Sequence, residues 1–178
     1  MIREINKFGS PLLNVKAVPV EIPKGSTGGL TSAVEGGRQW PEHIVNFVRD
    51  LTETAESMKA NCAGLAATQI YKETDGPECP AIITIKNLDG WLVAVNPIVK
   101  PMGKKVDMLE ACLSGPGQIY KVKRRANIWI SYVNLEFEEI ESKLYGEFMP
   151  VVFALQHEVD HLNGITIDKI GKLKHGKN

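Results

Sequence analysis

The sequence predicts an α+β fold, and three of its features support that prediction. Strand-like runs occupy the middle of the chain, one helical pattern precedes them, and a more apolar helical pattern follows near the C-terminus. Strands that come before a late helix, instead of alternating with helices, are typical of α+β proteins. The 178 residues show no repeat and no change of composition that would mark a boundary. We therefore expect a single domain over residues 1–178.

The individual elements follow from periodicity and from the residues that interrupt it. Residues 10–22 predict an extended lead-in, and the glycine-rich stretch 24–37 predicts a long loop. A helix is expected over residues 41–58, because apolar residues recur there at steps of three and four after a starting proline. After it we expect two strands joined as a hairpin, a third strand and an acidic segment with a turn, at residues 82–85, 91–95, 127–133 and 136–147.

Composition and charge argue against several classes of function. The chain has 21 Lys and Arg residues and 21 Asp and Glu residues, which disfavours a protein that binds nucleic acid mainly by charge. The charged N-terminus does not read as a signal peptide, and no apolar run is long enough to cross a bilayer. Three cysteines, an odd and sparse set, indicate a reducing compartment. We expect a cytoplasmic protein with no DNA or membrane partner.

The last helical segment carries the clearest chemical motif, Gln156-His157-Glu158-Val159-Asp160-His161. Histidines four residues apart project from one face of a helix, about one turn apart, so both imidazoles can bind one metal ion. Glu158 directly follows the first histidine, where its carboxylate can reach a water molecule beside the metal. Pro150 and Gly164 are expected to bound this helix. The alternative is a pair of solvated or core histidines with no ligand.

A catalytic metal of this type has three protein ligands and one open position, so a third ligand is needed. No glutamate follows Glu158, and Ile167 occupies the position where some helical zinc sites have a third histidine. His175, in a lysine-rich tail, is the remaining downstream candidate. Upstream, Cys112 lies in residues 110–117, which read as a short loop, and its thiolate suits Zn(II) or Fe(II) beside two imidazoles. A lone cysteine is often only a small buried hydrophobe, but the weak downstream candidates favour an upstream ligand.

Three segments together resemble the peptide deformylase family, whose three motifs occur in this order. The matching stretches are Cys62-x-Gly64-Leu65-Ala66-Ala67-x-Gln69, Glu110-Ala111-Cys112-Leu113-Ser114 and Gln156-His157-Glu158-x-x-His161, and Phe8-Gly9-Ser10-Pro11-Leu12-Leu13 also resembles the start of the family. Cys62 and Ala111 stand where the family has glycine. Each adds a small side chain where backbone passes closely, so we expect a changed pocket shape.

The resemblance implies antiparallel β-sheets packed around a central metal-binding helix. It also implies an enzyme that removes the N-formyl group from the formyl-methionine of nascent polypeptides and releases formate. Cys112, His157 and His161 would bind one divalent metal ion, Fe(II) in the cell, with Zn(II), Ni(II) or Co(II) as alternatives in purified protein. Glu158 would act as general base and then as general acid.

The resemblance assigns further roles at the same site. The Gln69 amide and the Leu113 backbone N–H would stabilise charge on the formyl oxygen. Gly64 would pair with the peptide backbone as an added strand, and Glu110 would lie beside the methionine pocket. We also expect an ion pair between Asp160 and Arg124, because one adjoins a ligand and the other follows the second motif.

The C-terminal segment is relevant to whether the protein binds the ribosome. Many bacterial members of the family carry a longer C-terminal helix associated with ribosome contact, whereas the short lysine-rich stretch after Gly164 predicts a solvated terminus here. We expect a monomer whose association with the ribosome is at most transient.

Two other functions fit the metal motif alone. A small zinc endopeptidase would use His157 and His161 with a different third ligand, so it would keep its metal and activity after Cys112→Ala. A metal-stabilised binding module would keep its function after Glu158→Ala, whereas an enzyme would keep its metal and lose turnover.

Overall fold

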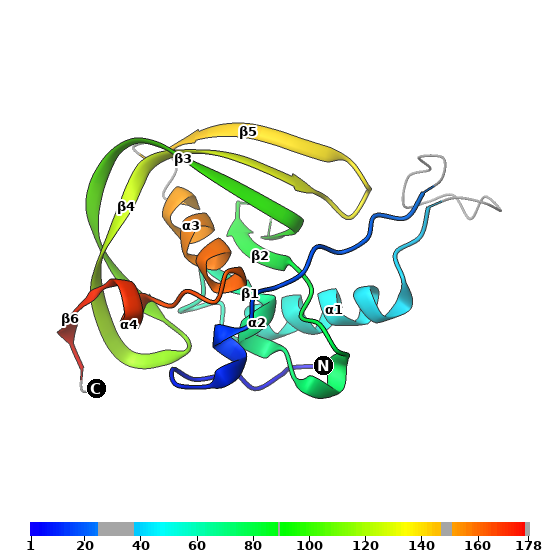
Figure 1. The fold of residues 1–178 in the computed structure, drawn as a ribbon, viewed down its shortest axis with the longest axis horizontal. Coiled ribbons are helices and arrows are strands. Elements are labelled where there is room, and N and C mark those ends of the chain that lie inside the picture. The colour runs from blue at the N-terminus through cyan, green and yellow to red at the C-terminus, as the bar shows by residue number, and fades with distance from the viewer. Residues whose placement is uncertain (25–37, 89, 147–150, 177–178) are drawn as a thin grey trace.

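The computed structural model describes residues 1–24, 38–88, 90–146 and 151–176 (Figure 1). In chain order the elements are the 3-10 helix η1 (Pro11–Asn14), α1 (Glu42–Ser57), β1 (Gly64–Ala66), α2 (Ala67–Ile70), the 3-10 helix η2 (Glu73–Asp75), β2 (Ile82–Asn87), β3 (Gly90–Cys112), β4 (Gly115–Val133), β5 (Glu139–Tyr145), α3 (Val151–Leu162), α4 (Ile167–Ile170) and β6 (Lys172–His175). The predicted α+β class is confirmed. None of the described helices combines the length and the apolar character needed to span a lipid bilayer.

The strands form one antiparallel sheet in the order β1-β2-β3-β4-β5, with β6 paired to β4. β3 and β4 are long, at 23 and 19 residues, and their pairing is interrupted by register shifts after Val95 and Met102. Asn96 and Gly103, at these two places, have positive φ angles of 54° and 68°. Such bulges bend a strand and increase its twist. The hairpin therefore curls around α3, which lies on its concave side (Figure 1).

The predicted hairpin is present, with strands that extend further than expected toward the turn. Ile82 pairs with Val95 and Asn87 pairs with Gly90. The strand predicted at residues 127–133 is the second half of β4, where it pairs with β5. β5 itself lies in the segment 136–147, where no strand was expected. Its charged residues alternate with half-buried ones, so one face of this edge strand is solvated, as antiparallel strands allow.

Two further expectations were wrong in part. Residues 110–117 are not a loop: β3 continues to Cys112 and β4 begins at Gly115, because the two strands stay paired almost to their ends. The stretch after Gly164 is not simply a solvated terminus, since it forms α4 and β6, although the side chains of Lys172 and Lys174 are exposed. The lead-in contains η1 at its start. The loop predicted at residues 24–37 lies, apart from Lys24, outside the described residues.

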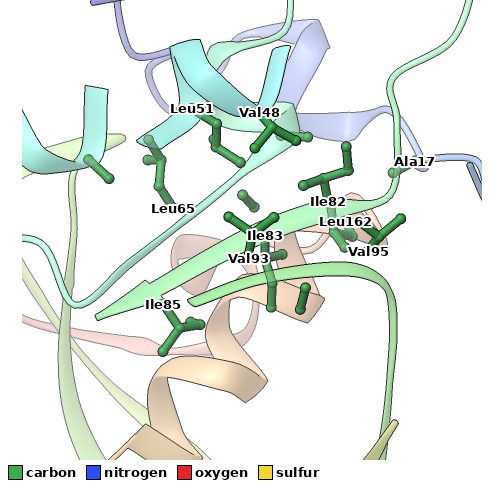
Figure 2. Close-up of a cluster of buried hydrophobic side chains, with 14 of the residues drawn as sticks. Ala17, Val48, Leu51, Leu65, Ile82, Ile83, Ile85, Val93, Val95 and Leu162 are labelled. Carbon is green, nitrogen blue, oxygen red and sulfur yellow. The ribbon is translucent and has the colours of Figure 1, made fainter. Parts of the chain in front are cut away.

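A hydrophobic core fixes β1 and β2 between two helices. The predicted helix 41–58 is α1, which buries Ile44, Phe47, Val48, Leu51 and Ala55. β2 has four successive buried residues, because α1 and α3 both pack against it. Figure 2 shows Leu51 and Leu65 facing the strand that carries Ile83, with Leu162 nearby. Each such side chain contributes roughly 1.5–3 kcal/mol to the free energy of folding when it is fully buried. This core therefore stabilises the position of β1 and of the residues that follow it.

Candidate active site

The helix α3 carries the two histidines of the motif. It ends at Leu162, and Gly164 follows with a φ of 72°, as a helix C-terminus favours; the expected start at Pro150 lies outside the described residues. His157 and His161 are both buried, with their ring centroids 4.9 Å apart and nearly perpendicular. The four-residue spacing therefore puts both imidazoles on the same face of α3, next to each other and inside the curled sheet.

Cys112 meets these histidines from the end of β3. Its Sγ lies 3.3 Å from Nε2 of His161, and one ligand atom from each of Cys112, His157 and His161 lies within 4.8 Å of the others. Metal–ligand bonds of about 2.0–2.3 Å place the ligands of a tetrahedral ion roughly 3.5 Å apart, so these spacings suit one ion. Among the described residues, Cys112, His157 and His161 are the group of Cys, His, Asp or Glu side chains that lie close enough together to bind one metal ion. His175 lies outside it, in the exposed strand β6.

One buried atom at this site supports the same interpretation. Glu158 Oε2 has no hydrogen-bond partner among the described residues. Buried polar atoms almost always have partners, including water or ions. The donor set of one thiolate and two imidazoles is suited to Zn(II) or Fe(II). The residues present therefore fit a bound divalent transition-metal ion.

A buried ion-pair network orients His157. Glu110 Oε2 lies 2.9 Å from Nδ1 of His157, which leaves Nε2 for the metal site. Arg124 donates from Nε and Nη2 to the two carboxylate oxygens of Glu110, at 2.6 and 2.8 Å, and its Nη1 donates to Asp160. Burial opposes ionisation of Glu110, but the hydrogen bonds from Arg124 and His157 outweigh it and lower its pKa to about 2. The expected pair of Asp160 and Arg124 is confirmed.

Glu158 and Gly64 are in close contact. A Cβ atom on Gly64 would lie 2.8 Å from Glu158 Cγ and 2.7 Å from Ile85 Cδ1, so only glycine lets β1 pass this close to α3. Burial raises the pKa of Glu158 to about 7. A carboxylate with a pKa near neutrality can both take and return a proton.

The Gln69 side chain is held in one orientation. Its Oε1 accepts a hydrogen bond from the Ala66 backbone N–H at 2.9 Å, which directs Nε2 toward Ser114 Oγ at 3.3 Å and Cys112 Sγ at 3.6 Å. Leu113 directly follows Cys112 in the turn, and its carbonyl accepts a hydrogen bond from Lys7 Nζ at 3.0 Å. An amide donor and a backbone segment thus flank the candidate metal site.

A cavity of about 260 Å³ opens beside these groups. Its lining includes Gly64, Gln69, Glu110, Cys112, Leu113 and Glu158. The structure therefore brings together all the residues to which the sequence analysis gave a role, with His161 packed behind Cys112. Met108 and Phe153 also line the cavity. They were not expected, although Met108 shares a strand face with Glu110 two residues on, which an alternating pattern would have indicated.

Three side chains that hold parts of the site in place also escaped the sequence analysis in this role. Gln156 accepts from the Arg125 N–H and donates to the Arg125 carbonyl, both at 2.9 Å, and so joins the helix to β4. Thr68 Oγ1 donates to the carbonyl of His161 at 3.2 Å. Ser114 receives the Gln69 amide. Each lies within or next to a motif, but its partner is distant in sequence.

The two departures from the family pattern both line the cavity. Cys62 is buried and its Sγ donates to the Gly64 carbonyl at 3.2 Å. Burial raises its pKa to about 12, and the charge of Glu158 acts in the same direction, so it remains a neutral thiol. Both departures therefore add a side chain to the lining of the cavity, Cys62 shortly before β1 and Ala111 near the end of β3.

The fold and the site together define a metal-dependent hydrolase. The sequence model of the family described as polypeptide deformylase matches residues 2–176, and the chain belongs to that family. A peptide deformylase of Dictyoglomus turgidum is 33% identical over 167 residues, which cover 94% of this chain and 91% of that one. A peptide deformylase of Halothermothrix orenii is 31% identical over 175 residues, covering 97% and 96%.

Solved structures are similar over nearly the whole chain. Peptide deformylase from Thermotoga maritima superposes with a TM-score of 0.72 at 24% identity and covers 96% of this chain and 97% of that one. The enzyme from Acinetobacter baumannii with Met-Ala-Ser bound gives 0.69 at 25% identity, covering 96% and 98%. The chain is thus a metal-dependent hydrolase that removes the formyl group from the start of nascent polypeptides.

Proposed function

We propose that Cys112, His157 and His161 hold one Fe(II) ion and that Glu158, Gln69 and Leu113 carry out deformylation around it. The proximity of the Cys112 thiol to the His161 ring carries this proposal. The donor set accepts both iron and zinc, and the resemblance to the family favours iron, with Zn(II), Ni(II) or Co(II) replacing it in purified protein. When bound, the ion supplies Lewis acidity, which polarises the formyl carbonyl and lowers the pKa of a water molecule.

The remaining steps belong to the side chains of this chain. Glu158 takes a proton from the attacking water, whose oxygen forms a bond to the formyl carbon. The Gln69 amide and the Leu113 N–H donate hydrogen bonds to the formyl oxygen as negative charge develops on it. The bond between the formyl carbon and the methionine nitrogen then breaks. Glu158 returns the proton to the departing amine, so formate and a free N-terminus are released.

Substrate binding uses the same cavity. We assign the backbone of Gly64 to pairing with the peptide as an added strand, because β1 pairs with β2 along one edge only among the described strands. The methionine side chain occupies the part of the cavity lined by Met108 and Phe153, beside Glu110. The Acinetobacter baumannii structure with Met-Ala-Ser bound supports a peptide as the ligand.

We also propose an oligomeric state, a cellular location and a partner for the protein. It is a single catalytic domain, a monomer located in the cytoplasm or the corresponding translation compartment, and it meets its substrate in transient association with the ribosome. Light scattering on a purified sample tests the monomeric state. Sedimentation with ribosomes at low and high salt tests the last one.

Formate release from formyl-Met-Ala-Ser tests the reaction. The protein is purified without oxygen, reconstituted with Fe(II), Zn(II) or Ni(II), and compared with Glu158→Gln. We expect the variant to bind the same amount of metal and to lose about 10²–10⁴-fold in rate, the usual contribution of a general base. Equal formate release by both proteins would remove Glu158 from the mechanism, and no formate from either would overturn the assigned reaction.

A further inference from the structure

A second cavity adjoins the catalytic one. Its volume is about 380 Å³, and its lining includes Lys59, Asn61, Cys62, Ala63, Lys86 and Ala154. Four of these residues, Asn61, Cys62, Ala63 and Ala154, also line the catalytic cavity. The segment that leads into β1 therefore forms a border common to both spaces. A ligand that extends past this border enters the second cavity.

The direction of β1 decides which part of a substrate arrives there. Gln69, one of the groups proposed to act on the formyl group, follows the C-terminal end of β1. A peptide that pairs with Gly64 in antiparallel orientation places its formyl end near Gln69 and runs toward Asn61. A parallel peptide would place its formyl end toward Ala63, away from Gln69. Only the antiparallel orientation is productive, so the residues after methionine lead to the second cavity.

The sequence distance from Gly64 indicates which residues these are. β1 begins at Gly64, and Asn61 lies three positions before it, in a turn. With the methionine beside Gly64, the residues that follow it leave the paired strand and pass Cys62 and Asn61, so the third and fourth residues of the substrate reach the second cavity.

Of the charged side chains described at this cavity, two are lysines and one is a glutamate, which leaves one positive charge in excess. Lys59 and Lys86 line it, and Glu56 pairs with Lys59 at 2.6 Å. Glu56 is already engaged a second time, because it accepts a hydrogen bond from Trp91 Nε1 at 2.8 Å. Lys86 Nζ donates to the carbonyl of Lys59 at 3.0 Å. Its charge acts on Glu56 from a distance, but Glu56 forms its ion pair with Lys59.

We propose that this second cavity binds acidic side chains at the third and fourth residues of the formylated peptide, with Lys86 as the main contact and Lys59 as the second. The inference rests on the function proposed above. It gives the chain a substrate preference that neither the metal site nor the methionine pocket supplies. The contacts are close to solvent, so the preference is modest and sensitive to salt.

The test compares peptides that differ only in the charge of these two residues. The substrates are formyl-Met-Ala-Glu-Glu, formyl-Met-Ala-Gln-Gln and formyl-Met-Ala-Lys-Lys, with formyl-Met-Ala as the short reference. In low salt we expect kcat/KM of the wild type to be about two- to fivefold higher for the acidic peptide than for the neutral one, and lower for the basic one. The differences should shrink in 0.5 M salt.

Variants assign the preference to the residues named. Lys86→Gln should abolish most of the discrimination and Lys86→Glu should reverse it, whereas formyl-Met-Ala should be hydrolysed as by the wild type. Lys174→Gln removes the same charge from β6, outside both cavities, and should keep the wild-type preference. Circular dichroism checks that each variant is folded.

The outcomes separate this inference from the function on which it rests. If formyl-Met-Ala is hydrolysed but the three longer peptides react equally, the second cavity has no such role. The same conclusion follows if Lys86→Gln and Lys174→Gln change the preference equally. If formyl-Met-Ala is not hydrolysed at all, the proposed function itself has failed.

Discussion

The buried side chain of Arg124 donates hydrogen bonds to both carboxylate oxygens of Glu110, with N–O distances of 2.6 and 2.8 Å. Glu110 in turn contacts Nδ1 of the metal-site residue His157. A second carboxylate, that of Asp160, contacts the same guanidinium. An arginine that touches neither metal nor substrate thus determines the orientation of a ligand. Two acidic residues depend on it for charge compensation.

Arg124→Met should therefore weaken both folding and metal binding. It leaves Glu110 and Asp160 without their cation, and breaking a buried pair in this way costs about 3–5 kcal/mol. Loss of an outer partner of a ligand histidine reduces metal affinity by about 10–100-fold. Urea unfolding and competition with a chromogenic chelator measure the two effects. Arg125→Met is the matched control, because Arg125 donates from an exposed position to the Gly103 carbonyl; equal effects of both changes would contradict the role of Arg124.

Gly64→Ala should reduce both activity and stability. The added methyl group would meet Glu158 Cγ and Ile85 Cδ1 at less than 3 Å, and overpacking of this kind costs about 1–3 kcal/mol. Displacement of the Glu158 carboxylate should lower kcat by more than it changes KM. Gly117→Ala is a useful comparison: the position has a φ of 76° but nothing near the new Cβ, so stability falls while kcat stays unchanged. An unchanged kcat in Gly64→Ala would show that the contact with Glu158 is unimportant.

Cys112→Ala should lose its metal ion, whereas Cys79→Ala should retain it. Both thiols are buried and free, but only Cys112 lies against the histidines. Metal analysis after gel filtration should find well under one equivalent in Cys112→Ala and close to one in Cys79→Ala. Full metal occupancy in Cys112→Ala would require a different third ligand.

Asp50 should contribute stability that disappears in acid. Burial opposes ionisation of Asp50, but hydrogen bonds from the N-terminal ammonium and from Arg3 outweigh it and lower its pKa; the Arg3 bond, Nε to Oδ2, is 2.8 Å long. A pKa lower in the folded than in the unfolded state stabilises the fold above the unfolded value of about 3.9, and the contribution is lost as the pH falls through the folded value.

The measurement compares wild type with Asp50→Asn by urea unfolding at pH 7 and at pH 3. The free energy of unfolding should be about 1–3 kcal/mol lower for Asp50→Asn at pH 7, and the two proteins should converge toward pH 3. A difference that is independent of pH would indicate a packing effect instead of the ion pair.

The elements recovered from the sequence were those with a local signal. The helix over residues 41–58 and the hairpin at Ile82–Val95 depend on periodicity and punctuation, and both are present. β5 was missed because the polar Ser142 stands between Ile140 and Leu144 on the half-buried face, so its apolar alternation is weak. The ends of β3 and β4 near Cys112 were mistaken for a loop, because glycine and proline in residues 110–117 resemble turn residues while the pairing of long strands holds them in the sheet.

By itself, the sequence determined the spacing of His157 and His161 and the presence of Glu158 between them, because neighbours on a helix are set by its geometry alone. Only the tertiary structure decided that Cys112 is the cysteine that approaches them, that Glu110 turns toward His157, and that Gly64 must lie against Glu158. These contacts join residues 47 or more positions apart in the first two cases. They depend on bulges, strand register and core packing, which no local pattern specifies.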